Sequence, residues 1–129
     1  MRAVLKSVAL VGLGGFAGAV LRYGVSQLAA RYLGDRFPYG TLLINVVGCF
    51  ALGAFAAWAL ERDGSEHWRL LVAVGVLGSF TTFSTFGVET LTLLRSGDTR
   101  GALLSVAANV GLGLLAAWSG AKCVGERVL

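Results

Sequence analysis

Four long stretches without a charged side chain constrain this sequence more than any other feature. They cover residues 7–21, 37–60, 70–88 and 101–121. A helix rises about 1.5 Å per residue, so about 20 apolar residues cross the roughly 30 Å hydrocarbon core of a bilayer. The second and fourth stretches reach that length unaided, and a soluble helix is rarely so long without a charge. The pattern therefore predicts an all-α integral membrane protein with four transmembrane helices.

The first and third stretches reach spanning length only when they are extended at their ends. The first does so if the helix begins near Ala3 and the Lys6 ammonium reaches the interface. The third continues through Glu89. We expect spans at residues 3–31, 37–60, 68–94 and 100–123, in one domain of residues 1–129. The N-terminal segment also has the layout of a cleaved signal peptide, but its apolar pattern runs on to Leu28, which favours a retained first span.

The composition limits the classes of function. Hydrophobic residues make up 56% of the chain and charged residues 14%, with a mean hydropathy of +0.75, whereas an average globular domain has about 25% charged residues. Cys49 and Cys123 lack metal-type spacing, His67 stands alone, and no phosphate loop or catalytic triad is recognisable. The basic residues cluster at span ends, which is typical of contacts with lipid headgroups. We therefore expect neither an enzyme nor a nucleic-acid-binding protein.

Positive charge is almost balanced between the two ends of the four spans. On one side are Arg2, Lys6, Arg62, Arg69, Lys122 and Arg127; on the other are Arg22, Arg31, Arg36, Arg95 and Arg100. The Lys and Arg asymmetry of the loops sets insertion orientation, so this chain has a weak orientation signal. Either another factor orients it, or it inserts both ways and pairs as an antiparallel dual-topology homodimer.

Small residues recur at the spacing that lets helix backbones approach closely in lipid. They form three small-x-x-x-small pairs, namely Gly14 with Gly18, Gly53 with Ala57 and Ala107 with Gly111. Helices in a membrane associate through such close contacts. The pattern predicts tight packing, and we expect it to serve the assembly of an oligomer.

The third span carries an unusual density of glycine and hydroxyl residues, reading GVLGSFTTFSTF over residues 75–86. Glycine lowers helix propensity, and Ser and Thr hydroxyls compete with the helical ladder for backbone groups. We expect a third helix broken at its centre, with a first half ending near Gly78 and a second half starting at residues 82–84. An intact helix whose hydroxyls bond back to the preceding turn is the alternative. A central break would present carbonyls suited to a cation and N–H groups suited to an anion.

The side chains around this segment favour a small anion. Phe83 and Phe86 lie three residues apart on one helix face, and an aromatic ring has a positive edge that can face an anion without a full charge. Amide donors and hydroxyls are available nearby, and the four uncharged stretches contain no Lys or Arg. The candidate anion path consists of Asn45, Phe83, Ser84, Thr85, Phe86 and Asn109, with Arg22 raising the anion concentration at one mouth.

Three stretches resemble the signatures of a known family. Residues 14–23 (GGFAGAVLRY), 40–48 (GTLLINVVG) and 78–86 (GSFTTFSTF) are similar to the signature stretches of the bacterial fluoride channels called Fluc or CrcB. The resemblance covers all four spans in order. It implies a fluoride-selective channel, built as an antiparallel dual-topology homodimer with two pores, that exports cytoplasmic fluoride passively through the cell inner membrane and lowers its toxicity.

The resemblance also implies roles for individual residues. Phe83 and Phe86 would line the pores, Ser84 and Thr85 would form the polar track, and Asn45 and Asn109 would flank it. A structural Na⁺ at the dimer interface would be held by the backbone carbonyls of Gly78 and Thr81 of each subunit. The sequence departs from the family pattern twice, with Ser79 in place of a second Gly and Ser105 in place of a Tyr that some members carry.

Two other functions are compatible with parts of the pattern. A small proton-coupled dual-topology exporter of organic cations would also have four spans, but it needs a carboxylate deep in its first span, and residues 7–21 contain none. Glu89 is the one intramembrane carboxylate, and the sequence does not distinguish a proton-coupling role from a hydrogen bond across a helix interface. A structural subunit of a larger membrane complex is the third interpretation.

Overall fold

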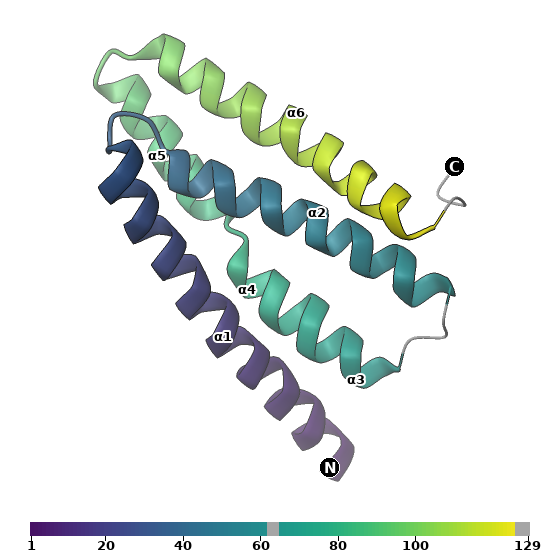
Figure 1. Cartoon of the computed structure of the whole chain (residues 1–129). Coiled ribbons are helices and arrows are strands. Elements are labelled where there is room, and N and C mark those ends of the chain that lie inside the picture. The colour runs from purple at the N-terminus through teal and green to yellow at the C-terminus, as the bar shows by residue number, and fades with distance from the viewer. Residues whose placement is uncertain (62–64, 126–129) are drawn as a thin grey trace.

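The computed structural model describes residues 1–61 and 65–125, and every regular element in these ranges is a helix (Figure 1). In chain order they are α1 (Arg2–Leu33), α2 (Tyr39–Glu61), α3 (Glu66–Trp68), η1 (Arg69–Leu77), α4 (Gly78–Phe80), α5 (Phe83–Arg95) and α6 (Thr99–Val124). Elements α3 to α5 together make the third long segment. The four segments Arg2–Leu33, Tyr39–Leu60, Glu66–Arg95 and Thr99–Val124 are each long and apolar enough to cross a membrane.

The four segments run back and forth along one direction, so the ends of the molecule alternate (Figure 1). The N-terminus, the start of α3 and the end of α6 lie at one end. The α1–α2 and α5–α6 connections lie at the other, and Gly34 and Gly97 take positive φ there. Helix α2 packs along α6, and α1 packs along η1 and α4. Arg62 and Arg127, two of the charges in the predicted balance, lie outside the described residues.

Glycine permits the closest helix contacts. Gly14 and Gly18 of α1 lie against the η1 backbone, where a Cβ on either would collide with the carbonyl oxygens of Leu71 and Val76 respectively. Gly53 of α2 packs in the same way on Ala117 of α6. A Cβ on Gly111 would meet nothing within 4 Å. Two of the three predicted small-residue faces therefore pack helices within the chain, and the Gly111 face does not.

The third segment is interrupted near its middle, as the glycine and hydroxyl pattern predicts. Element η1 is a π-helix, and the N–H of Gly78 still donates to Ala73 O, five residues back. Thr81 (ψ 156°) and Thr82 (φ −151°) are extended, and α5 begins at Phe83. The alternative of an intact helix is therefore wrong. The first half ends at Phe80 rather than near Gly78, because the N–H and the hydroxyl of Thr81 both donate to Leu77 O at 3.1 Å.

Candidate functional site: a hollow at the helix break

A hollow of about 250 Å³ lies beside the break in the third segment. Three long segments contribute to it: α2, the break with the start of α5, and α6. It is lined by Asn45, Gly48, Cys49, Leu52, Thr81, Thr82, Phe83, Phe86, Asn109 and Val110. None of these residues carries a formal charge. Four of the predicted path residues, Asn45, Phe83, Phe86 and Asn109, thus come together from three helices.

The Asn45 side chain pairs with the Thr82 peptide group inside this hollow. Its Oδ1 accepts the Thr82 N–H at 2.9 Å, and its Nδ2 donates to Thr82 O at 3.2 Å. In a continuous helix the Thr82 N–H would bond to Gly78 O, four residues earlier. The amide of α2 therefore takes over backbone hydrogen bonds that the break removes from the third helix.

The amide donors are already partly engaged. Asn45 Nδ2 also donates to Asn109 Oδ1 at 2.9 Å, which together with Thr82 O uses both of its hydrogens. Asn109 Nδ2 donates to Ser105 O at 3.0 Å. One N–H of Asn109 is left without a partner among the described residues. The sequence predicted anion donors at both Asn45 and Asn109; in this structure both N–H groups of Asn45 Nδ2 are engaged within the chain, and Asn109 keeps one N–H without a partner among the described residues.

The two Phe rings of α5 have different environments. Their centroids lie 5.5 Å apart with planes tilted by 58°. Phe86 is buried, with 8% of its surface exposed, while Phe83 is 81% exposed. Phe83 lines the hollow and is also exposed. In a single chain, the hollow therefore opens to the outside at Phe83.

Thr82 organises the start of α5 and is a site residue that sequence reasoning missed. It is the N-cap: its Oγ1 accepts the Thr85 N–H at 3.3 Å, donates to Thr85 Oγ1 at 2.9 Å and lies 3.4 Å from Ser84 Oγ. Thr82 is buried, whereas Ser84 and Thr85 are exposed and do not line the hollow. The preference of Thr for N-caps was the available signal.

The remaining predicted residues lie around the hollow rather than in it. Arg22 is half-buried on α1 and forms no ion pair with another described residue. Gly78 is exposed one turn before the break. Ser79 faces α1, where a Cβ on Gly15 would come within 3.2 Å of its Oγ. Ser105 is fully buried, with its Oγ 3.3 Å from Thr90 Oγ1, and so joins α6 to α5.

Glu89 lies one turn beyond Phe86 and lines a second hollow of about 250 Å³ under the α1–α2 connection. Buried Thr41 lines the same hollow. Glu89 Oε2 is buried and has no hydrogen-bond partner among the described residues. The sequence allowed this carboxylate to form a hydrogen bond across a helix interface. Within the described chain, Oε2 does not form one.

Comparison with known proteins decides the family. The family model described as "CrcB-like protein, Camphor Resistance (CrcB)" matches residues 9–121, a range that contains most of each of the four segments. This chain belongs to the CrcB-like family. CrcB-like relatives named "Fluoride-specific ion channel FluC" include one from Dehalococcoides mccartyi, 46% identical over 91% of each chain. Another from Rhizobium etli is 47% identical over 86% of this chain and 90% of its own. One from Shewanella amazonensis is 44% identical over 96% and 100%.

Membership of the CrcB-like family confirms the resemblance seen in the sequence. The family is one of channels rather than enzymes, and its members are multi-pass membrane proteins. The glycines that pack α1, the Asn of α2 and the hydroxyl-rich break all lie within the matched residues. The CrcB-like match therefore covers every element that builds the hollow.

Proposed function

We propose that this CrcB-like chain forms a fluoride-selective channel that lets cytoplasmic fluoride leave passively through the bacterial inner membrane. The observation that carries the proposal is the uncharged hollow at the helix break, in a chain whose relatives at 44–47% identity are named fluoride-specific channels. Fluoride is small and strongly hydrated, so a path must replace part of its water with donors. The free Asn109 N–H and the positive edges of Phe83 and Phe86 supply such groups.

The absence of full charge among the residues that line the hollow suits conduction. An ion must bind well enough to enter a pore and weakly enough to leave it. A lysine or arginine beside the ion would hold fluoride too tightly, whereas dipoles and ring edges give a shallower well. Arg22 lies outside the hollow, and there it raises the local anion concentration without binding the ion on its path.

The channel is completed by a second copy of the same chain in the opposite orientation. Phe83 is 81% exposed, and this large ring at the mouth of the hollow needs a partner surface to enclose a pore. Balanced Lys and Arg at the two ends favour insertion in both senses. An antiparallel pair places the two helix breaks next to each other at mid-membrane and creates two equivalent pores.

The break fits a structural Na⁺ shared by the two subunits. Carbonyl oxygen is a hard ligand that suits such a cation. Extended Thr81 holds its carbonyl outside the helical ladder, and the Thr82 N–H, the helical partner of Gly78 O, is donated to Asn45 instead. Gly78 and Thr81 of each subunit would therefore hold the ion, which supplies positive charge between the paired breaks.

Flux through liposomes tests the channel function. Purified protein in liposomes should release fluoride much faster than chloride, without a proton gradient. Phe83→Ile and Asn45→Asp should each slow fluoride release by about tenfold or more, which corresponds to a loss of about 1.4 kcal/mol on the path. Phe16→Ile is the matched control, since Phe16 is 74% exposed on α1, away from the hollow.

Three outcomes would contradict the proposal. One is protein that gives no fluoride flux, and another is protein that releases fluoride and chloride equally. The third is a pH-driven flux of organic cations that Glu89→Gln abolishes, which would identify a proton-coupled exporter. Glu89 Oε2 is buried without a hydrogen-bond partner in the described part of the chain, which makes that control necessary.

A further inference from the structure

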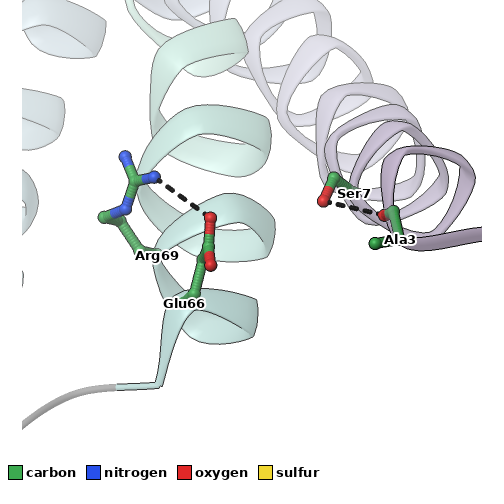
Figure 2. A network of polar contacts seen from close by, with 4 residues as sticks. All are labelled: Ala3, Ser7, Glu66 and Arg69. Atoms are coloured by element: carbon green, nitrogen blue, oxygen red, sulfur yellow. Dashed lines mark hydrogen bonds and ion pairs between the residues drawn. The ribbon is translucent and has the colours of Figure 1, made fainter. Parts of the chain in front are cut away.

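A third hollow lies at the opposite end of α1 from Arg22 and shares no residue with the site at the break. It has a volume of about 340 Å³ and is formed where the start of α1 meets the start of the third segment. It is lined by Arg2, Ala3, Lys6, Ser7, Glu66, His67 and Leu70. Figure 2 shows three of these residues, with Ala3 and Ser7 on α1 and Glu66 on the neighbouring helix, where Glu66 pairs with Arg69.

The hollow has an excess of positive charge. Arg2 and Lys6 are four residues apart, so they lie on one face of α1. Glu66 Oε1 is 3.8 Å from Arg69 Nη2, and this ion pair offsets the carboxylate. Among the side chains that the structure describes, those of residues 1–60 and 65–125, no carboxylate lies within ion-pair distance of Arg2 or Lys6. Two cations thus line a concave surface whose one acidic group already has a basic partner.

The hollow lies at the end of two apolar segments, where we expect the lipid headgroups. Arg2 and Glu66 are the first residues of two of the membrane-spanning segments. Trp68, which is 53% exposed, lies directly after His67, and aromatic residues of this kind sit at the membrane interface. On α1 the cations have exposed apolar neighbours, since Val4, Leu5 and Val8 are each more than 60% exposed. A cationic hollow next to exposed apolar helix surface has the polarity of a phospholipid.

We propose that this hollow binds the headgroup of an anionic phospholipid, with Arg2 and Lys6 holding its phosphate and the acyl chains lying along α1. The charge balance selects an anionic lipid over a zwitterionic one, because the ammonium of a zwitterionic headgroup would lie beside Arg2 and Lys6. Ser7 donates its hydroxyl hydrogen to Ala3 O at 3.2 Å, so its oxygen remains as an acceptor for a headgroup hydroxyl. The site depends on membrane insertion and not on fluoride conduction.

Lipid retention measured by native mass spectrometry tests the site. Full-length protein in detergent would be titrated with phosphatidylglycerol, phosphatidylethanolamine or inorganic phosphate. We expect selective retention of phosphatidylglycerol, and the double variant Arg2→Gln/Lys6→Gln should weaken it about thirtyfold, from two interfacial cations. Arg95→Gln/Arg100→Gln is the matched control, because it removes two exposed cations at the other end and should leave retention unchanged.

Each possible result decides the proposal. Equal loss in the two double variants, or equal retention of phosphatidylethanolamine, would overturn it. Displacement of phosphatidylglycerol by inorganic phosphate would also overturn it, because the ligand would then be free phosphate rather than a lipid. A single symmetric elution peak and an unchanged helical circular dichroism spectrum would show that the double variants are folded. Fluoride flux is measured separately, so its absence would contradict the channel function and not the lipid site.

Discussion

At the scale of single residues, the side chain of Asn45 forms hydrogen bonds with the backbone where the third helix is broken. A helix break in a membrane exposes N–H and C=O groups that no water can satisfy, and each costs several kcal/mol unless it finds a partner. The amide of Asn45 satisfies both polar groups of Thr82 at 2.9 and 3.2 Å. A primary amide carries a donor and an acceptor side by side, and can therefore pair with a peptide group in both directions.

Removal of this amide should therefore loosen the break. Asn45→Ala leaves the Thr82 N–H and C=O unpaired, and we expect a loss of about 1–3 kcal/mol of stability. Thermal unfolding in detergent measures the loss. Ser84→Ala is the control on the same segment, because exposed Ser84 makes one long contact of 3.4 Å, and we expect a change within about 0.5 kcal/mol. An Asn45→Ala protein as stable as the parent would show that Asn45 does not hold the break.

The sequence marked Asn45 as a candidate site residue without showing that its amide pairs with Thr82. Its position inside an apolar span marks it as functional, since polar groups there are costly. Its contact with Thr82 spans 37 residues of sequence, and only the packing of α2 against the break brings the two together. The same limit explains why the sequence placed Phe83 and Phe86 on one face without showing that one is exposed and the other buried.

At the scale of elements, α1 supports the first half of the broken span through glycine. Gly14 and Gly18 let the α1 backbone lie directly on η1. The break itself was predictable, because glycines and hydroxyl residues weaken a helix locally. The π-helical form of η1 was not predicted, and it coincides with the stretch that α1 contacts. The end of the first half also depends on contacts of Thr81 with Leu77 that a residue pattern does not specify.

Two alanine substitutions on α1 should have opposite effects. In Gly18→Ala the new methyl group meets the backbone of Val76, which cannot move aside as a side chain would, so we expect a loss of about 1–3 kcal/mol. In Gly24→Ala the methyl group meets nothing within 4 Å, and higher helix propensity should add about 0.5–1 kcal/mol. Unfolding of both variants in detergent measures the difference. Equal effects would contradict close packing of α1 on η1 at Gly18.

At the scale of the whole molecule, four helices leave the hollow at the break open on one side. Phe83, the more exposed of the two Phe residues beside the hollow, lies on the outer surface of the chain. The small-residue face at Gly111 also packs on nothing within 4 Å. The described residues contain four long apolar helices, and none of these covers the hollow on that side. The proposed antiparallel dimer would supply that cover, and the nearly equal charges at the two ends permit the second copy to insert in the opposite orientation.

Added positive charge at one end should fix the orientation in which the protein inserts, so that two variants charged at opposite ends insert in opposite senses. Ser65→Lys with Cys123→Lys adds positive charge at the end that holds the N-terminus, and Gln27→Lys, Tyr32→Lys and Ser96→Lys together add it at the other end; all five positions are exposed. Each variant should insert in one sense, as reported by accessibility of a C-terminal tag from one side of the membrane. Alone, each should give fluoride flux no higher than empty liposomes, whereas the co-expressed pair should recover the parental flux. Full flux from either variant alone would contradict an antiparallel channel.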